Sequence, residues 1–525
     1  MVSIVEYVFD QAERTPDTAA LLSEGQTTTY AELVGQAGRL GCALLSVAPP
    51  GGHQVVGIAA ETSLSAHAGI LSIWAAGAAY TPLNPHHPLS RRLELVERAG
   101  VDTLIVGPEA LNDLDAFLSQ APRPLTLLLP ELEHQTALRA AHPKHRLLFA
   151  PDLPPAPLPH AWRYVDPQAL AYLLFTSGST GTPKGVPITH ANVGAYLEHA
   201  RQAWPLQPGE RVSRTFELTF DLSVHDLLTA WSSGATLVPL TRRDRLSPGR
   251  FILEHQLTRF FCVPTLAAAM ARHGQLPPGG LGTLKSVLFC GEALPMGVAR
   301  AFARAAPRAE LFNLYGPTEA TIAICARQLT PELLNQGEGS APLGEPFAGH
   351  EAVVVDQEGQ PQPTGEPGEL WLRGPQVFAG YWKDDARSAE ALAPGAFYRT
   401  GDRVVRDERG ELRFVGRLDT QLKVRGHRIE PAEVEAALAR ALGHAQVACL
   451  PFPSEPRAAD HLVALIAHPT ELSPSAEQAL RQRLLAELPA YMVPERLLAL
   501  PTLPQNSNGK LDRRALALYL NTLRE

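Results

Sequence analysis

Short apolar runs alternate with amphipathic segments along the first 150 residues. The runs 55–59 (VVGIA) and 103–106 (TLIV) are apolar at almost every position, which is typical of buried strands. Between them, apolar residues around Ile70 and Trp74 recur at helical spacing, and residues 91–99 predict a further helix. Strands separated by helices indicate largely parallel sheets with helices on their faces, so we expect an α/β fold.

The C-terminal part of the chain predicts a separate, small α+β domain. Its expected elements are, in chain order, a helix from Pro431 to Gly443, strands at 447–450 and 462–466, and a helix that starts at Ser473. Glycine just past the last apolar helical position is a common helix end. We therefore divide the chain into a large domain, residues 1–417, and a small domain, residues 418–525, with a hinge near Asp419.

Composition narrows the possible functions. The chain has 525 residues, 45% of them apolar and 19% charged, so it can bury a large core. Its formal charge of −8 argues against a nucleic-acid partner, which requires a basic surface. The five cysteines form no Cys-x-x-Cys pair, and the N-terminus lacks the features of a signal peptide. The most apolar stretch, residues 66–80, is broken by Gly77, so we expect a cytoplasmic protein without a membrane partner.

Residues 176–185 (TSGSTGTPKG) follow the apolar run 171–175 and form the most informative stretch of the chain. Glycines allow tight turns that point backbone N–H groups at an anion, hydroxyls donate to phosphate oxygens, and Lys184 adds a positive charge. A Walker A loop is excluded because Pro183 precedes the lysine and glycine follows it. A flexible linker is the alternative. The residues predicted to hold phosphate are Thr176, Ser177, Gly178, Ser179, Thr180, Gly181 and Lys184.

This loop and an ordered series of further motifs resemble those of the adenylate-forming ligases, which are acyl-CoA synthetases, luciferases and the amino-acid adenylation domains of nonribosomal peptide synthetases. The other motifs are AGAAYTPL (76–83), NLYGPTE (313–319), GEL (368–370) with GYW (380–382), YRTGD (398–402), GRLD (416–419), KVRGHR (423–428) and NGK (508–510). One such motif could occur by chance, but the ordered set covers nearly the whole chain. The resemblance implies a large N-terminal domain of mixed and parallel sheets flanked by helices, and a small, mobile α+β C-terminal domain.

The resemblance implies carboxylate activation, in which a substrate carboxylate attacks the α-phosphate of ATP to give an acyl-adenylate and pyrophosphate. Because two anions meet, positive charge and a metal must screen them. Lys510 would bridge the carboxylate and the α-phosphate, Thr318 would hydrogen-bond the α-phosphate, and Glu319 would bind Mg²⁺. The alternatives are an exposed lysine in a tail turn and an ordinary turn at 315–317. ATP and Mg²⁺ are the expected cofactors.

The resemblance also implies nucleotide contacts outside the phosphate loop. Tyr315 would lie against adenine, Asp402 would accept both ribose hydroxyls, and Arg417 is a weaker ribose or phosphate candidate. A plain loop and a surface arginine are the alternatives for the last two. The remaining members of the predicted nucleotide set are Gly291, Glu292, Asn313 and Gly316.

The segment FDLSVHD (220–226) separates the subfamilies. In amino-acid adenylation domains an aspartate at the position of Asp221 holds the substrate ammonium, and a buried carboxylate is costly without such a cation. An aspartate that caps the following helix is the alternative. Carried over from the family, the pocket consists of Asp221, Leu222, His225, Phe261, Leu288, Cys290, Leu314, Ile322 and Ala323, with Lys510. This mostly apolar, compact lining favours a small neutral L-amino acid. The pattern of Leu222, Leu288 and Leu314 resembles that of free-standing prolyl-adenylating enzymes, and partly that of cysteine- and serine-selecting ones, so proline is the first expectation. His225 departs from the aromatic residue or leucine usual at its position.

A second half-reaction is implied as well. The small domain would rotate about Asp419, withdraw Lys510 and turn the loop 425–427 toward the site for thioester formation, with a static linker as the alternative. Fifteen residues follow Lys510, so we expect a monomer that loads the phosphopantetheine arm of a separate carrier protein in nonribosomal peptide synthesis. A chain cut from a larger synthetase is the competing explanation. A coenzyme A ligase of the same superfamily and a non-catalytic ATP-binding regulator are the alternative functions.

Overall fold

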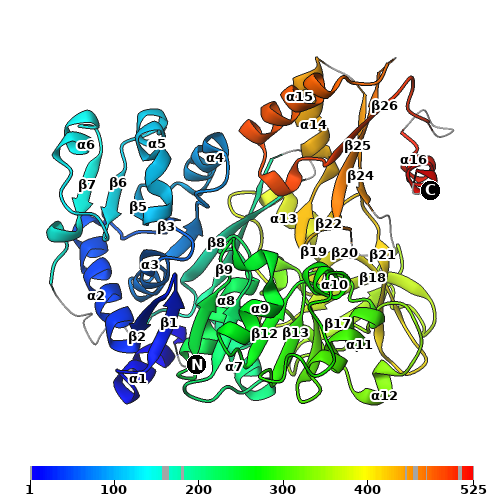
Figure 1. Ribbon diagram of the computed structural model, residues 1–525, viewed down its shortest axis with the longest axis horizontal. Helices are drawn as coiled ribbons and strands as arrows, with labels where there is room; N and C mark the ends of the chain where they lie inside the picture. Colours follow the sequence, from blue (N-terminus) through cyan, green and yellow to red (C-terminus); the bar gives the residue numbers. More distant parts are fainter. Residues whose placement is uncertain are drawn as a thin grey trace.

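The structure is a computed structural model that describes residues 3–155, 165–178, 182–443, 446–452, 459–468, 470–505 and 511–523. Two large sheets form the centre of the N-terminal region, residues 3–417 (Figure 1). The first has seven strands in the order β7 (Arg146–Phe149), β6 (Thr126–Leu129), β5 (Thr103–Val106), β3 (Val55–Ala59), β4 (Ala79–Pro82), β8 (Leu170–Thr176) and β9 (Lys184–Thr189). Its strands pair in parallel, except that β9 runs antiparallel to β8. The phosphate loop, residues 176–185, therefore connects β8 to β9 at one edge of this sheet.

The second sheet has nine strands. Their order is β16 (Glu345–Pro346), β15 (Cys325–Gln328), β14 (Glu310–Tyr315), β13 (Ser286–Phe289), β12 (Arg259–Cys262), β10 (Arg211–Arg214), β11 (Thr236–Pro239), β1 (Ala19–Ser23) and β2 (Gln26–Thr29). Strands β14 to β1 pair in parallel, and β15, β16 and β2 are antiparallel at the edges. Parallel strands end at a common edge, so the residues that follow β12, β13 and β14 meet there.

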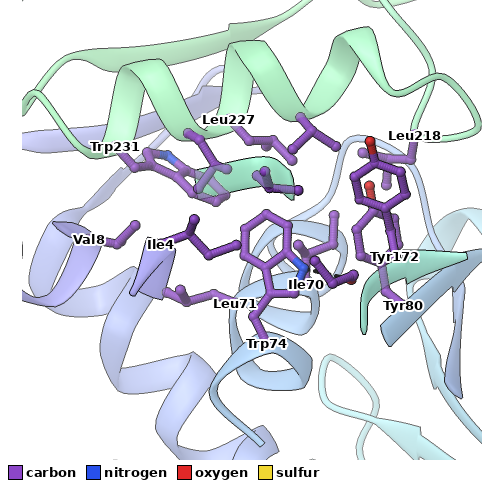
Figure 2. Packing of buried hydrophobic residues seen from close by; sticks show 14 of the residues in the cluster. Ile4, Val8, Ile70, Leu71, Trp74, Tyr80, Tyr172, Leu218, Leu227 and Trp231 are labelled. Atoms are coloured by element: carbon purple, nitrogen blue, oxygen red, sulfur yellow. Dashed lines mark hydrogen bonds between the residues drawn. The ribbon is translucent and has the colours of Figure 1, made fainter. Parts of the chain in front are cut away.

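Most helices of the N-terminal region cover the faces of the two large sheets. The helices of this region are α1 (Ile4–Arg14), α2 (Tyr30–Val47), α3 (Leu64–Ala75), α4 (Leu89–Ala99), α5 (Leu114–Gln120), α6 (Thr136–Ala141), α7 (His190–Ala203), α8 (Leu222–Trp231), α9 (Pro248–Glu254), α10 (Pro264–Arg272), α11 (Met296–Ala305), α12 (Pro331–Leu334) and α13 (Asp385–Ala391). Of these, α12 packs against α11, and α13 packs against β19 (Leu392–Ala393) and β20 (Phe397–Arg406) of a smaller sheet. Figure 2 shows α1, α3 and α8 packed together through buried apolar side chains. Trp74 of α3 donates its indole N–H to the carbonyl of Ala171 (2.8 Å), and Trp231 of α8 donates to that of Ala20 (3.2 Å). Each helix is thus tied to its own sheet, which sets the two sheets relative to one another.

A smaller antiparallel sheet completes the N-terminal region. It is formed by β17 (Glu351–Val355), β18 (Pro367–Arg373), β20 (Phe397–Arg406) and β19 (Leu392–Ala393), and β21 (Leu412–Arg417) pairs with β20. Its apolar face packs in one cluster with Tyr315, the last residue of β14, and Ile324, which directly precedes β15. This packing brings Asp402, in the middle of β20, next to the end of β14.

The C-terminal region, residues 418–523, begins with a hairpin of β22 (Leu422–Val424) and β23 (His427–Ile429). A three-stranded sheet of β24 (Val447–Phe452), β25 (His461–Ala467) and β26 (Arg496–Leu500) follows. Helices α14 (Pro431–Leu442) and α15 (Pro474–Glu487) pack with the hairpin on one face, and α16 (Arg513–Thr522) packs on the other (Figure 1). The hairpin and α16 therefore lie on opposite sides of the small sheet.

The expected fold class is confirmed, and several elements begin and end where the sequence predicts. Strand β3 spans residues 55–59 and β5 spans 103–106, as the continuous apolar runs indicate. Helix α14 starts at Pro431 and ends at Gly443, whose φ of 74° is the left-handed conformation that glycine adopts most easily. Ser473 caps α15 through its side chain. Short-range signals were sufficient for these elements.

Candidate active site

A cavity of about 120 Å³, which we call the reaction cavity, lies between the two large sheets, the smaller antiparallel sheet and the β22–β23 hairpin. It is lined by Thr176 and Ser177 from the phosphate loop, Asp221 before α8, Thr318 after β14, and Asp402 from β20. The β22–β23 hairpin closes it with Lys423 and residues 426–428. A second cavity of about 110 Å³ adjoins it and is lined by Gly291, Glu292, Tyr315 and Gly316. The fold thus brings residues that are far apart in the sequence to one place.

The phosphate loop has the tight geometry that its glycines predict. A Cβ on Gly178 would lie 1.9 Å from the carbonyl oxygen of Thr182, so no side chain fits there. Ser177 donates its hydroxyl to the carbonyl of Arg428 in the hairpin (2.7 Å). Lys184 lies over the ring of Tyr381 at 5.3 Å, and burial lowers the pKa of its ammonium. Ser179, Thr180 and Gly181 lie outside the described residues.

Glu319, the predicted metal ligand, is fully buried and forms an ion pair with Arg428 through both of its carboxylate oxygens. Arg428 donates to both carboxylate oxygens through Nη1 (3.0 and 2.8 Å), and the Tyr381 hydroxyl donates to one of them (2.9 Å). Burial alone would raise the pKa of Glu319, but the charges of Arg428 and Lys184 outweigh burial and lower it to about 2. Glu319 is therefore a fixed, fully buried negative charge next to Thr318, which lines the cavity.

Asp402, the predicted ribose ligand, has both oxygens engaged. The Tyr315 hydroxyl donates to Oδ2 (2.6 Å), and Arg417 donates to Oδ1 through Nη1 (2.5 Å). The same guanidinium donates from Nε and Nη2 to Asp419 (2.6 and 2.5 Å). Arg417 thus links the predicted ribose carboxylate to the predicted hinge, and a bound ribose would have to displace these donors.

Of the other predicted nucleotide residues, Gly291, Glu292 and Gly316 line the second cavity, and Asn313 does not. Gly291 has a φ of 96°, and a Cβ on Gly316 would lie 2.6 Å from the Cα of Ala323, so both positions require glycine. Glu292 accepts backbone N–H bonds from Thr265 (2.9 Å) and from Gly426 of the hairpin (2.6 Å). Asn313 is buried at the end of β14 and donates to the carbonyl of Pro342 (2.7 Å).

Asp221 occupies the N-cap position of α8 but makes no side-chain capping bond. Its Oδ2 instead accepts the backbone N–H of Ile322 (3.0 Å). Burial raises the pKa of this carboxyl to about 6, because its hydrogen bonds only partly replace lost water. The capping alternative therefore does not describe this side chain, which lies instead at the wall of the cavity.

The segment that presents the Ile322 N–H to Asp221 is strained. Thr321 and Ile322 have φ values of 55° and 72°, a left-handed conformation that is costly for β-branched residues. The fully buried Gln376 supports this segment, since its amide N–H₂ donates to the carbonyls of Ala320, Thr321 and Ala323 (3.3, 3.0 and 2.7 Å). The Thr321 hydroxyl in turn donates to the carbonyl of Gln376 (2.6 Å).

The predicted amino-acid pocket is buried and belongs to one apolar cluster. Its members in that cluster are Leu222, Phe261, Leu288, Cys290, Leu314, Ile322 and Ala323. His225 lies among them, 1% exposed, with its ring edge-on to Phe261 at 4.8 Å between centroids. Its Nδ1 lies 2.7 Å from the hydroxyl of Tyr196, and burial lowers its pKa well below the ordinary value. His225 is therefore neutral and anchored within this cluster. Of the predicted pocket residues, Asp221, Leu222 and Cys290 line the first cavity and Leu314 lines the second.

Several residues around this site received no role from the sequence. Arg428 and Tyr381 belong to the KVRGHR and GYW motifs, so the sequence marks them as candidates for the site. The sequence does not indicate that both side chains contact Glu319. Tyr196 and Gln376 lie in stretches without any motif, and only the structure brings them to the pocket. Lys510 lies outside the described residues. The residues that flank it pair as a β-bridge between Gln505 and Leu511, on the α16 side of the small sheet.

The C-terminal region contacts the N-terminal region at further points around the cavity. Glu433 of α14 pairs with Arg91 of α4 (3.0 Å), and Asp460 pairs with Arg272 of α10 (3.1 Å). His427 stacks on Tyr491 at 3.6 Å between ring centroids and meets Phe220 edge-on. The hairpin is thus held over the cavity by side chains from both regions.

The fold, the phosphate loop and the buried carboxylates together define an ATP-using, AMP-forming ligase. The chain belongs to the AMP-binding enzyme family, which matches residues 8–382. The expected resemblance to adenylate-forming enzymes and the expected enzyme class are confirmed. Among the described residues, no helix combines the length and apolar character needed to cross a bilayer.

Relatives and solved structures give more detail. The chain is 35% identical over 530 residues to the phosphinothricin tripeptide synthetase PhsB of Streptomyces viridochromogenes, a match that covers 96% of this chain and 41% of that protein. It is 29% identical over 525 residues to D-alanine–D-alanyl carrier protein ligase of Bacillus licheniformis, covering 98% of this chain and 99% of the ligase. The adenylation domain AlmE of Vibrio cholerae, solved with glycyl-adenosine-5'-phosphate, superposes with a TM-score of 0.89 at 29% identity, covering 98% and 97% of the chains. The chain spans 6–44% of the length of four peptide synthetases that it matches.

Proposed function

We propose that the protein activates a small neutral L-amino acid with ATP as aminoacyl-AMP and transfers it as a thioester to the phosphopantetheine arm of a separate carrier protein in nonribosomal peptide synthesis. The observation that carries the proposal is Asp221. Its carboxylate is buried at the cavity wall, and no described side chain gives it a cationic partner. A buried, unpaired carboxylate is costly, so a substrate ammonium is the group that suits this position.

The first half-reaction of the proposal uses the roles that the family resemblance implies for these residues. The substrate carboxylate attacks the α-phosphate of ATP, and pyrophosphate leaves. The phosphate loop and Lys184 hold the outer phosphates, Thr318 binds at the α-phosphate, and Lys510 bridges the two reacting groups. Asp402 takes the ribose hydroxyls when the Tyr315 hydroxyl and Arg417 release it, and adenine lies in the second cavity beside Tyr315.

Glu319 suits a Mg²⁺ ion that arrives with ATP. It is a buried carboxylate close to Lys184, and the described residues hold no cluster of three or more His, Cys, Asp or Glu that could bind a metal on its own. The phosphates would supply the remaining oxygen ligands, and the ion would screen charge between the reacting anions. Arg428 now pairs with both Glu319 oxygens, so the hairpin must withdraw before Glu319 can serve as a ligand.

The pocket lining supports a compact, uncharged side chain. Phe261, Leu288 and Leu314 are bulky and buried, and His225 is neutral because its pKa is far below neutrality. No acidic or basic residue among the predicted pocket positions, apart from Asp221 and Lys510, could pair with a charged substrate side chain. Proline is our first candidate, followed by other small neutral amino acids.

A third cavity supports the thioester step. It has about 590 Å³ and shares Phe220, His427 and Tyr491 with the reaction cavity. Arginines line it from both regions: Arg242, Arg245, Arg272 and Arg425. A long pantetheine arm with a phosphate at its far end suits such a passage. The Bacillus licheniformis relative is a carrier protein ligase by name, which supports a carrier as the thiol donor.

The two half-reactions require two positions of the C-terminal region, residues 418–523. In the structure the hairpin faces the site, and the residues that flank Lys510 lie on the opposite side of the small sheet. A rotation about Asp419 would exchange these two faces. We propose a monomer in which adenylation uses the Lys510 face and thioester formation uses the hairpin face.

ATP–pyrophosphate exchange across a panel of amino acids tests the proposal. Signal is expected with proline or another small neutral amino acid, and Asp221→Asn should abolish it, while the exposed-site control Asp115→Asn should retain it. No exchange with any amino acid, or exchange with the same acids lacking an amino group, would refute amino-acid activation. Supplying either a phosphopantetheinylated carrier or free coenzyme A then separates the proposal from the coenzyme A ligase alternative, because only the true acceptor consumes the adenylate.

A further inference from the structure

A pocket on the outer side of the phosphate loop is strongly cationic, although the whole chain carries a formal charge of −8. It measures about 220 Å³ and is lined from three segments: the end of α4, the end of β8 with the last residues of the phosphate loop, and the turn 381–384 with the first turn of α13. Four lining side chains are cations and one is a carboxylate, namely Arg98, Lys184, Lys383, Arg387 and Asp384, a formal balance of 4 − 1 = +3. The activation chemistry accounts only for Lys184.

The three walls of this pocket are tied together. Trp382 donates its indole N–H to the carbonyl of Arg98 (3.2 Å) and its backbone N–H to that of Gly185 (2.9 Å). Lys383 adopts a left-handed backbone conformation with a φ of 53°, and its ammonium lies over the Trp382 ring at 5.0 Å. Lysine in this conformation is uncommon, and here it keeps the ammonium at the pocket.

Local carboxylates balance these cations only in part. Arg98 pairs with Glu94 one turn earlier (2.8 Å), but Glu94 also pairs with Arg91 (3.2 Å). Asp384 lies 3.4 Å from the Arg387 guanidinium and also accepts the Arg387 backbone N–H as the cap of α13. Glu319 and Glu430 also act on the charge of Lys184. Four cations against one carboxylate in the lining still favour a multiply charged anion at this pocket.

We propose that this pocket is a holding site for inorganic pyrophosphate after it leaves the reaction cavity. The choice of anion rests on the proposed function, which releases pyrophosphate at the phosphate loop. Phe175 lines both the reaction cavity and this pocket, and Lys184 ends the loop at the pocket wall. On the side of the loop that faces the reaction cavity, the Ser177 hydroxyl donates to the carbonyl of Arg428 in the β22–β23 hairpin. A pyrophosphate that moves to the cationic pocket on the other side of the loop therefore meets cations and leaves this contact with the hairpin intact.

Titration calorimetry of the full chain with inorganic pyrophosphate tests this site. Lys383→Met and Arg98→Met should each weaken binding about fivefold, as loss of one partly exposed charge predicts. Arg250→Met is the matched control, since Arg250 is also a helical arginine paired with a glutamate one turn away. ATP binding should stay within about twofold of the parent protein in all three variants, because the lost charges lie outside the reaction cavity.

Equal pyrophosphate affinity in the parent protein and in both pocket variants would overturn the site. So would an equal loss in Arg250→Met, or a parallel loss of ATP binding, since both would indicate only a general field. Titrations with sodium phosphate and with tripolyphosphate test whether the pocket prefers pyrophosphate. If either of these anions binds more tightly than pyrophosphate, the pocket is a site for that anion and the proposal is wrong. The measurement needs no amino acid, so it stands even if the exchange panel shows no amino-acid activation.

Discussion

Gln376 is predicted to hold the segment that positions Asp221, and Gln376→Leu tests this. The side-chain amide makes hydrogen bonds of 2.7 and 3.0 Å to the carbonyls of Ala323 and Thr321, and a longer one of 3.3 Å to that of Ala320. Each net hydrogen bond contributes about 1 kcal/mol, and an unsatisfied buried carbonyl adds a desolvation cost. We therefore expect a loss of about 2–4 kcal/mol in the free energy of unfolding.

The functional effect should be selective. Without Gln376 the left-handed conformations of Thr321 and Ile322, which cost about 1–3 kcal/mol each, can relax, and the Ile322 N–H then turns away from Asp221. A hydrogen bond to a charged group contributes about 1.5–3 kcal/mol, so KM for the amino acid should rise about tenfold or more. KM for ATP should change less than about twofold, because the phosphate loop is not touched.

Urea unfolding and ATP–pyrophosphate exchange, with each substrate varied in turn, measure these two effects. Gln328→Leu is the control, since Gln328 makes one exposed hydrogen bond to Glu310 (3.1 Å) and should change neither quantity appreciably. If Gln376→Leu loses stability but keeps both KM values, Gln376 does not position Asp221. If both KM values rise together, the effect is a general loss of native enzyme.

Three further predictions concern the two half-reactions. Lys510→Ala should nearly abolish adenylate formation while ATP binding, followed by calorimetry, persists; near-normal exchange would contradict its bridging role. Asp419→Pro should spare exchange but block loading of a carrier, measured by intact-protein mass spectrometry, and an equal loss of both steps would count against the hinge. Burial raises the pKa of Asp221 to about 6, so this carboxyl gains a proton as the pH falls through that value and KM for the amino acid should increase below about pH 6. A KM that stays flat from pH 8 to pH 5, in buffers where the enzyme remains folded, would show that Asp221 does not hold the ammonium.

Much of the candidate site could be predicted because it lies in contiguous motifs. The phosphate loop, the NLYGPTE segment and the YRTGD segment are each short, and each carries its chemistry in neighbouring residues. Asp221 could be singled out in the same way, but not its environment. That it forgoes capping α8 and accepts a hydrogen bond from Ile322 depends on a partner 101 residues later in the chain.

The sequence by itself determined the elements of this protein: buried strands, capped helices and a glycine-rich loop follow from periodicity, backbone preference and side-chain chemistry within a few residues. Only the tertiary structure decided the partnerships, such as Glu319 with Arg428 across 109 residues and Tyr196 with His225 between two helices. The physical reason is that local preferences act over one or two turns of chain. A buried charge or imidazole takes its partner, and with it its pKa, from whatever the packing of whole sheets brings within hydrogen-bond distance.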